Sequence, residues 1–472
     1  MKKTSAIALV LVTAAGGSAA YLSIQTGSKT VRMTRQTAGQ GDAEGYISST
    51  GASFVSGRDP ARRRMGAATT GYGFSRIAHR SNPESAGRAS ASGEGFRFEA
   101  FTIFPIEQGL AKSVAIGDVT GDGKQDVVLT TMRTGYPDDR KVFVYRQDAS
   151  GGLAAPIKFE YASYSETAGL ALGDMNNDGV KDIIVGHDQG ITIALGGAQV
   201  FTPALIPLPE RMIDLGVMDI DRDGNLDVIG QSWEHGATLV YGNGQGGMRE
   251  SAELATEAMG YNDLKIGDVT GDGFEDLVIS EGQWLNRLWV FAHDGVKGFK
   301  PPQVYDYSRP YVRHAGLAIG DFNADGLNDV ALSEPLNTPT YIKIIHQGTT
   351  GMLSPVPVMM ASYETPEPLV AVDLDRNGLM DLVTMHPGWS AIGYYLQTAS
   401  GMSSEVLMPL PENVTTHYES SGLAAGDINS DGCPDIAGAD YGDGLRVIYG
   451  TGCSLPRPRV TGGPLAPRVK RP

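Results

Sequence analysis

A nine-residue stretch rich in aspartate recurs seven times along this chain of 472 residues and constrains its fold more than any other feature. The first copy, residues 118–126, places oxygen-bearing side chains at positions 1, 3, 5 and 9 and a glycine at position 6. Successive copies begin 45 to 56 residues apart. A repeat at such a period indicates one stacked architecture rather than a series of separate domains.

The pattern of oxygen atoms suits a hard cation. Calcium takes about six to eight oxygen ligands, and a glycine permits the sharp bend that turns alternate side chains inward. We therefore expect up to one calcium ion per copy, bound by the side chains at positions 1, 3, 5 and 9 and by the backbone carbonyl of position 7. The expected ligands are Asp118, Thr120, Asp122, Lys124, Asp126, Asp174, Asn176, Asp178, Val180, Asp182, Asp219, Asp221, Asp223, Asn225, Asp227, Asp268, Thr270, Asp272, Phe274, Asp276, Asp321, Asn323, Asp325, Leu327, Asp329, Asp373, Asp375, Asn377, Leu379, Asp381, Asp427, Asn429, Asp431, Cys433 and Asp435.

Two alternatives compete with these calcium sites. The first is that the loops are solvated turns without metal. In that case the clustered carboxylates of each loop would repel one another and their pKa values would be raised, and this would have to occur in all seven loops. An EF-hand requires flanking helices and a glutamate at position 12, which no copy has. Asn377 replaces the aspartate at position 5 of the sixth copy, so we expect that site to be the weakest.

Each copy lies between two apolar runs, such as residues 114–116 and 127–129, and two further strand-like runs follow it. Four short strands per unit, repeated around a circle, predict an all-β, seven-bladed β-propeller of four-stranded blades over residues 96–455. The last unit has a short or missing fourth strand, whereas the run at residues 98–104 has no unit of its own. We expect this N-terminal strand to complete the last blade and close the ring.

The two ends of the chain differ in amino-acid composition from the repeats. Residues 1–20 combine Lys2 and Lys3, a short apolar run and small residues, which predicts a signal peptide, with an uncleaved anchor as the alternative. Residues 21–95 are rich in Gly, Ser and Arg and predict a disordered linker, which either contacts an anionic envelope surface or is merely solvated. Residues 456–472 form a basic, proline-rich tail. We expect a monomer that is secreted, periplasmic or at the cell surface.

The net charge of the chain and its two cysteines indicate which class of partner to exclude and whether a disulfide forms. The formal net charge is −16, and both ends are basic, so the repeats are more acidic still. A nucleic-acid partner is therefore not expected, because phosphate binding needs a basic face. The two cysteines, Cys433 and Cys453, both lie in the last repeat, and we expect them to form a disulfide in an exported protein, with two free thiols as the alternative.

The loops and their flanking strands resemble the FG-GAP/VCBS repeats of bacterial secreted proteins and of the integrin alpha head. The resemblance is carried by residues 116–126 and their six counterparts, and it covers about residues 96–455. It implies a seven-bladed β-propeller with calcium in the loop that joins the first two strands of each blade. Met218 and Val372 depart from the glycine that the family places before the first aspartate.

In such a propeller, the loops opposite the calcium loops would form a ligand face. Aromatic and charged residues gather in these loops, including His187 and His386, although packing between blades is the alternative for many of them. The sequence favours a non-enzymatic binding or adhesion scaffold for carbohydrate or protein ligands, and no catalytic residue is assigned. The alternative is a polysaccharide lyase or hydrolase, for which Tyr311, Arg313 and His314 are the best candidates. The candidate ligand-face residues are Trp233, Trp284, Tyr311, Arg313, His314 and Trp389.

Overall fold

The structure is a computed structural model, and it divides the chain into two compact units, Met1–Arg88 and Ala89–Pro472. In the first unit it describes the backbone of five strands. In the second it describes residues 95–453 apart from residues 108, 133–139, 162, 164–168, 198–199, 233–235, 256–261, 282–286, 308–315, 335–339, 388–389 and 411–420. Among the residues described, no helix is long and apolar enough to cross a membrane.

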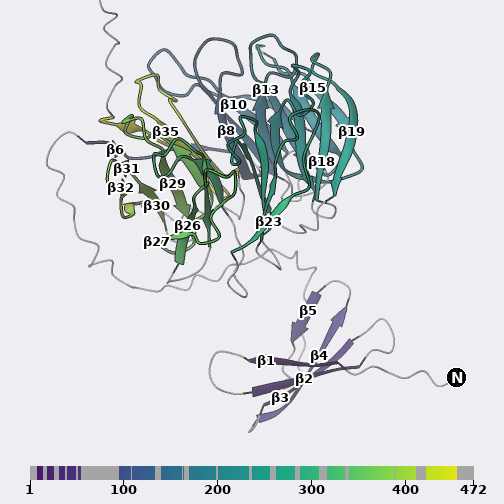
Figure 1. The fold of residues 1–472 in the computed structure, drawn as a ribbon. Helices are drawn as coiled ribbons and strands as arrows, with labels where there is room; N and C mark the ends of the chain where they lie inside the picture. Colours follow the sequence, from purple (N-terminus) through teal and green to yellow (C-terminus); the bar gives the residue numbers. More distant parts are fainter. Residues whose placement is uncertain are drawn as a thin grey trace, which may run out of the picture. The chain divides into compact units, whose positions relative to one another are not determined.

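The five strands of the first unit pair with their sequence neighbours in one antiparallel sheet, in the order β1-β2-β3-β4-β5 (Figure 1). They are β1 (Ala8–Thr13), β2 (Ala19–Gln25), β3 (Val31–Thr37), β4 (Gln40–Ser48) and β5 (Gly51–Phe54). This sheet runs through the predicted signal peptide and into the segment for which the sequence predicts disorder. The signal peptide, the linker and the basic tail remain predictions.

The second unit is a β-propeller, and its described residues form seven four-stranded antiparallel sheets (Figure 1). The first two strands of every blade flank one aspartate loop. Blade 1 is formed by β8 (Leu110–Gly117), β9 (Asp126–Met132), β10 (Lys141–Tyr145) and β11 (Ile157–Glu160). Blade 2 is formed by β12 (Gly169–Gly173), β13 (Asp182–His187), β14 (Gly190–Ala194) and β15 (Pro203–Pro207). Blade 3 is formed by β16 (Met212–Met218), β17 (Asp227–Ser232), β18 (Gly236–Gly242) and β19 (Met248–Ala255).

The next three blades repeat the plan, and blade 6 adds a small hairpin. Blade 4 is formed by β20 (Asn262–Gly267), β21 (Asp276–Glu281), β22 (Arg287–Phe291) and β23 (Gln303–Asp306). Blade 5 is formed by β24 (Leu317–Gly320), β25 (Asp329–Ser333), β26 (Thr340–Ile345) and β27 (Val358–Ser362). Blade 6 is formed by β28 (Leu369–Val372), β29 (Asp381–His386), β30 (Ala391–Tyr395) and β33 (Val406–Pro409), with the hairpin β31 (Gln397–Thr398) and β32 (Gly401–Met402).

Blade 7 is completed by a strand from the other end of the propeller. Its first three strands are β34 (Leu423–Gly426), β35 (Asp435–Asp440) and β36 (Gly444–Ile448), and its fourth is β7 (Thr102–Pro105). A second pair, β37 (Gly450–Thr451) with β6 (Arg97–Phe98), extends this junction. The predicted closure by an N-terminal strand is confirmed, and so is the all-β, seven-bladed fold.

The core consists of apolar clusters between neighbouring blades. One cluster joins Val128 of blade 1 to Ile183 of blade 2, and another joins Val127 of blade 1 to Ala437 of blade 7, so the ring is also packed shut. The residue at position 2 of every aspartate loop is buried in one of these clusters. These residues are Val119, Met175, Ile220, Val269, Phe322, Leu374 and Ile428. Each loop is thus fixed to the core by its second residue.

Candidate metal centre

The seven aspartate loops share one backbone conformation. The glycine at position 6 has a positive φ in every copy, between 82° in Gly123 and 92° in Gly432. Glycine adopts this left-handed region without the steric cost that a Cβ atom brings. The residue at position 4 is also left-handed in all seven copies, even where it is not glycine, as in Arg222 and Ala324. The two left-handed residues bend the loop around the carboxylate of position 1.

The aspartate at position 1 organises the inside of the loop. In the second copy, Asp174 accepts hydrogen bonds from the backbone N–H groups of Asp178, at 3.1 Å, and Gly179, at 2.8 Å. The position-5 aspartate, Asp178, accepts one from the N–H of Val180 at 2.8 Å. A carboxylate oxygen has a second lone pair, so these bonds fix the side chains and leave them able to bind a cation.

The aspartate at position 9 starts the second strand and is fully buried in all seven copies. In the third copy, Asp227 Oδ2 accepts a hydrogen bond from the N–H of Ile220 at 2.8 Å, and Oδ1 accepts one from the N–H of Gly242 at 2.7 Å. It therefore ties the loop to the end of the third strand of its blade. The sequence predicted this residue only as a metal ligand, and this structural role was missed.

Burial strongly perturbs the position-9 carboxyl groups. It raises the pKa of Asp126, Asp227 and Asp381 to about 6 and that of Asp435 to about 7. Neighbouring carboxylates add to the effect, as Asp122 does for Asp126. A cation in the loop would favour the charged forms of all these groups.

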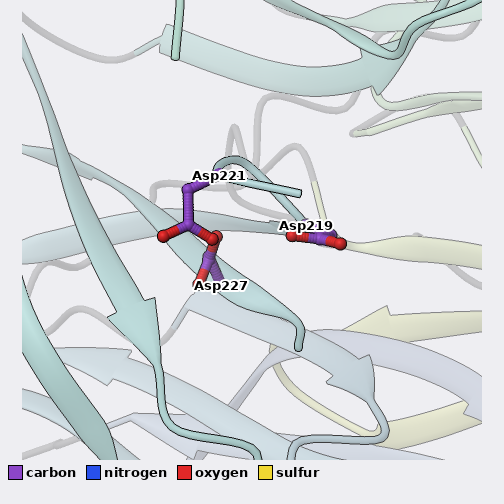
Figure 2. Close-up of side chains that lie close together, drawn as sticks. All are labelled: Asp219, Asp221 and Asp227. Atoms are coloured by element: carbon purple, nitrogen blue, oxygen red, sulfur yellow. The ribbon is translucent and has the colours of Figure 1, made fainter. Parts of the chain in front are cut away.

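Two loops bring three carboxylates together most closely among the described residues. In the third loop, ligand atoms of Asp219, Asp221 and Asp227 lie within 4.8 Å of one another (Figure 2). The sixth loop has the same arrangement in Asp373, Asp375 and Asp381. These acidic groups are able to hold a metal ion, because oxygen ligands at such separations suit a hard divalent cation.

The first and last loops provide a test of fit for a metal ion. Asp126 Oδ1 in the first loop and Asp427 Oδ1 in the seventh are buried, and neither has a hydrogen-bond donor among the described residues. A buried carboxylate oxygen without a partner is costly unless a cation or water satisfies it. The donor sets of these two loops therefore fit the predicted ion.

Basic side chains enter three of the loops, which the loop sequences did not indicate. Arg249 Nη2 lies 3.0 Å from Asp221 Oδ2, Lys300 Nζ lies 3.4 Å from Asp272 Oδ2, and His346 Nδ1 lies 3.0 Å from Asp329 Oδ2. Arg249 and Lys300 come from near the fourth strand, and His346 follows the third. The sequence signal that could have revealed these contacts is a basic residue just after the third strand of a blade or near the start of its fourth.

The predicted ligand face is largely outside the described residues. The six candidates Trp233, Trp284, Tyr311, Arg313, His314 and Trp389 all lie there, so the structure neither brings them together nor separates them. His187 and His386, also expected on this face, are described and fully buried. His187 Nε2 lies 2.8 Å from Thr192 Oγ1, and His386 Nε2 lies 3.0 Å from Glu405 Oε1. Each ring also contacts a tyrosine that follows the preceding blade, Tyr161 for His187 and Tyr363 for His386, so both histidines pack in the core.

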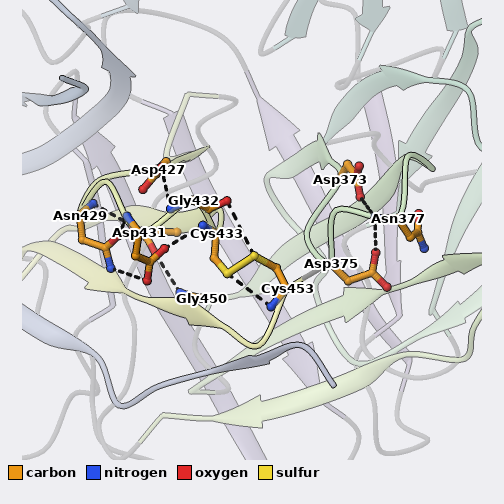
Figure 3. Close-up of a disulfide and its surroundings, with 11 residues drawn as sticks. Asp373, Asp375, Asn377, Asp427, Asn429, Asp431, Gly432, Cys433, Gly450 and Cys453 are labelled. Atoms are coloured by element: carbon orange, nitrogen blue, oxygen red, sulfur yellow. Dashed lines mark hydrogen bonds between the residues drawn. A yellow bond between two sulfur atoms is a disulfide. The ribbon is translucent and has the colours of Figure 1, made fainter. Parts of the chain in front are cut away.

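The seventh loop is covalently tied to the end of its blade. Cys433, at position 7 of the loop, and Cys453 form a disulfide with an S–S distance of 2.06 Å (Figure 3). The backbone N–H of Cys433 donates to Asp431 Oδ1 at 2.7 Å. The disulfide therefore joins the candidate metal loop to the strand pair that closes the ring.

Similarity to known proteins agrees with this architecture. A family model described as an FG-GAP-like repeat matches residues 118–185, 219–279 and 268–332. Mouse integrin alpha-IIb is 27% identical over 171 residues, which are 31% of this chain and only 16% of the integrin.

Solved structures resemble the chain in fold. A lectin from Agrocybe aegerita, described as recognising non-reducing terminal N-acetylglucosamine, has a TM-score of 0.50 at 17% identity, covering 73% of this chain and 86% of the lectin. BBS1N in complex with ARL6DN has a TM-score of 0.54 at 11% identity, covering 77% of this chain and 97% of BBS1N. At such identities the likeness concerns the fold alone. The chain is a seven-bladed β-propeller that contains segments similar to FG-GAP-like repeats, and about a third of it is similar in sequence to part of an integrin alpha subunit.

Proposed function

We propose that this protein is a calcium-stabilised, extracytoplasmic binding scaffold. The observation that carries the proposal is the repetition of one loop in all seven blades, with left-handed residues at positions 4 and 6 and a buried aspartate at position 9 each time. The disulfide between Cys433 and Cys453 supports an oxidising location outside the cytoplasm. The partial similarity to an integrin alpha subunit supports the same location.

The residues that would hold the ion are those at positions 1, 3, 5, 7 and 9. When bound, calcium would supply the positive charge that offsets the clustered carboxylates. In the first loop, Asp118 is already held by the N–H groups of Gly121, at 2.6 Å, and Gly123, at 2.8 Å, so little reordering is needed. Asp126, which is buried, would gain a partner for its Oδ1 atom.

Calcium should therefore raise the stability of the folded chain by mass action, since the unfolded chain does not bring the ligands together. Thermal unfolding in excess chelator is expected to occur well below unfolding in calcium. A chelator-free sample at matched ionic strength controls for screening. Identical unfolding curves in chelator and calcium would refute structural calcium.

The ligand of the scaffold is proposed to be a carbohydrate or a protein that binds opposite the aspartate loops. Aromatic faces next to charged groups suit sugar rings, and one fold relative is described as recognising N-acetylglucosamine. Trp284, Trp389 and His314 are the positions to test, singly changed to alanine. Glycan-array binding should be lost while thermal stability is kept, because exposed substitutions typically change stability by less than about 0.5 kcal/mol.

A matched control for these variants is Val296→Ala, since Val296 is 70% exposed and lies in the turn after the third strand of blade 4. This change should alter neither binding nor stability. Loss of stability in the tryptophan variants, with no ligand found for the parent, would assign those residues to blade packing instead. Incubation with acidic polysaccharides, followed for the absorbance of new double bonds, tests the lyase alternative directly.

A further inference from the structure

We propose, on the basis of the calcium function proposed above, that the guanidinium of Arg249 takes the place of the metal ion in the third loop. The third loop would then be filled by a positive charge from the chain itself and bind no calcium. The sixth loop, which has the same three converging aspartates, would bind calcium because none of the basic side chains that the structure describes enters it.

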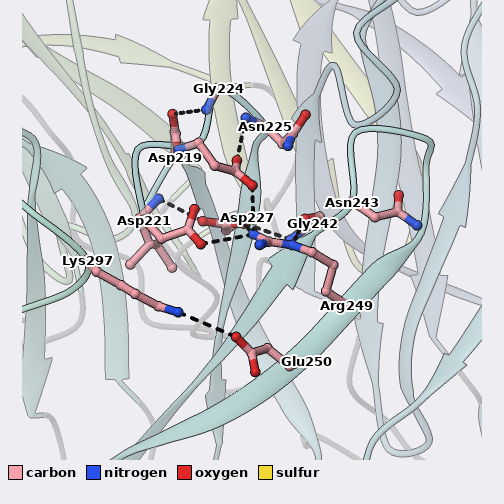
Figure 4. A network of polar contacts seen from close by, with 12 residues as sticks. Asp219, Asp221, Gly224, Asn225, Asp227, Gly242, Asn243, Arg249, Glu250 and Lys297 are labelled. Carbon is pink, nitrogen blue, oxygen red and sulfur yellow. Dashed lines mark hydrogen bonds and ion pairs between the residues drawn. The ribbon is translucent and has the colours of Figure 1, made fainter.

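Arg249 belongs to β19 and reaches back into the loop of its own blade (Figure 4). Its Nη2 atom lies 3.0 Å from Asp221 Oδ2, 3.0 Å from Asp223 Oδ2 and 4.0 Å from Asp227 Oδ1. These three carboxylates are predicted ligands at positions 3, 5 and 9. A single positively charged nitrogen therefore lies among the oxygens that an ion would bind.

Arg249 also makes two contacts outside the aspartate loop, which fix its guanidinium. Its Nε donates a hydrogen bond to the backbone carbonyl of Gly242 at 2.6 Å, and its guanidinium lies 5.9 Å from the ring centre of Tyr241. Five N–H donors in a fixed plane suit guanidinium to bridge several acceptors at once. The side chain is thus tethered to the loop's own blade.

The sixth loop is a natural comparison because its sequence is nearly the same. Both loops have aspartates at positions 1, 3 and 9 and a left-handed arginine at position 4, Arg222 or Arg376. They differ at position 5, where Asp223 pairs with Arg249 and Asn377 carries no charge. The extra carboxylate of the third loop is thus matched by the extra cation, and both loops present the same net charge.

Among the described residues, no basic side chain contacts Asp373, Asp375 or Asp381 (Figure 3 shows the first two with Asn377). The sixth loop therefore keeps its carboxylates available. In the third loop, a divalent ion and the guanidinium would lie within a few ångströms and repel each other, so the two cations exclude one another. The sequence alone predicted that the sixth site is the weakest. The comparison of the two loops predicts instead that the sixth loop binds calcium and the third does not.

Counting bound calcium by native mass spectrometry of the full chain tests the proposal. Asp221→Asn and Asp375→Asn change the same position in the two loops. We expect Asp221→Asn to leave the number of bound ions unchanged and Asp375→Asn to lower it by one. Arg249→Gln should raise it by one, because both oxygens of Asp221 then become available; its Oδ1 has no donor among the described residues even with Arg249 in place.

A second readout is the melting temperature in chelator and in calcium. Arg249→Gln should melt below the parent in chelator and regain stability when calcium is added. A parent that binds calcium but loses one ion on Asp221→Asn would overturn this inference and leave the calcium function intact. So would a folded Arg249→Gln variant that gains no ion. A parent that binds no calcium at all would overturn both.

Discussion

The carboxylate of Asp182 accepts a hydrogen bond from the backbone N–H of Gly196 across 2.7 Å, although 14 residues separate the two in sequence. Its other oxygen accepts one from the N–H of Met175 at 2.8 Å. Asp182 is fully buried, so one side chain joins the aspartate loop, the second strand and the end of the third strand. The same bridge recurs in the third blade through Asp227.

Replacing Asp182 by alanine should therefore destabilise the protein even when no calcium is present. The buried N–H of Met175 and the partly buried N–H of Gly196 would lose their carboxyl acceptor, at a cost of about 2–4 kcal/mol. The exposed Asp178, at position 5 of the same loop, should cost stability on change to alanine only in calcium. Urea unfolding of both variants in chelator and in calcium measures the difference, and equal losses for the two variants in chelator would contradict it.

Acid sensitivity should depend in part on His187. Burial lowers the pKa of this histidine to about 4, whereas the unfolded residue titrates near its ordinary value of 6.5. Since the unfolded chain binds the proton more readily, stability is full above pH 6.5 and is lost as the pH falls toward 4. The loss at pH 4 is about 3 kcal/mol from the two pKa values.

A His187→Gln variant should lose less stability than the parent between pH 7 and pH 4. Denaturant titrations at four pH values give both curves, and the difference between them isolates this residue from other titrating groups. Parallel curves for parent and variant would show that His187 does not contribute.

Two positions of the fifth loop have left-handed backbone conformations, and substitutions at them should change stability in opposite directions. Ala324 is exposed and has a φ of 61°, so Ala324→Gly should stabilise by about 0.5–1 kcal/mol through relief of backbone strain. Gly326 has a φ of 85° and open space around its Cβ position, so Gly326→Ala should destabilise by about 1 kcal/mol without a clash. Thermal unfolding of both variants checks the pair, and changes of the same sign would be contrary to expectation.

The disulfide between Cys433 and Cys453 should contribute measurable stability. It closes a segment of 20 residues, for which the loss of unfolded-state entropy is worth about 3 kcal/mol. A reductant should lower the unfolding midpoint of the parent and leave a Cys433→Ser/Cys453→Ser variant unchanged. Intact-mass measurement after alkylation without reductant reports the bond itself, and two labelled thiols would disprove it.

The fold was predictable because its signal is repeated and local. Seven copies of one loop fixed the number of blades, and the unmatched run near Phe104 indicated the closure. The roles of Asp182 and Arg249 were not predictable in this way. Gly196 and Arg249 reach their aspartates only through the pairing of later strands, so sequence distance conceals the contacts.

Burial was the other property that the loop pattern did not reveal. His187 and His386 are the last residues of the second strands β13 and β29, next to the predicted surface loops, yet both are fully buried. The apolar residue at position 2 of every loop was visible in the sequence. It would have indicated that each loop is anchored between blades, as Val119 is.

The closure of blade 7 has a mechanical consequence. Thr102 of β7 pairs with Val447 of β36, and Arg97 of β6 pairs with Thr451 of β37, so the two chain segments enter and leave at the same end of the junction. Tension between them would load one strand pair at a time and unzip the junction rather than shear it. Because Cys453 is bonded to Cys433, the C-terminal strand stays fixed to its blade, and the strand released under load is the N-terminal one.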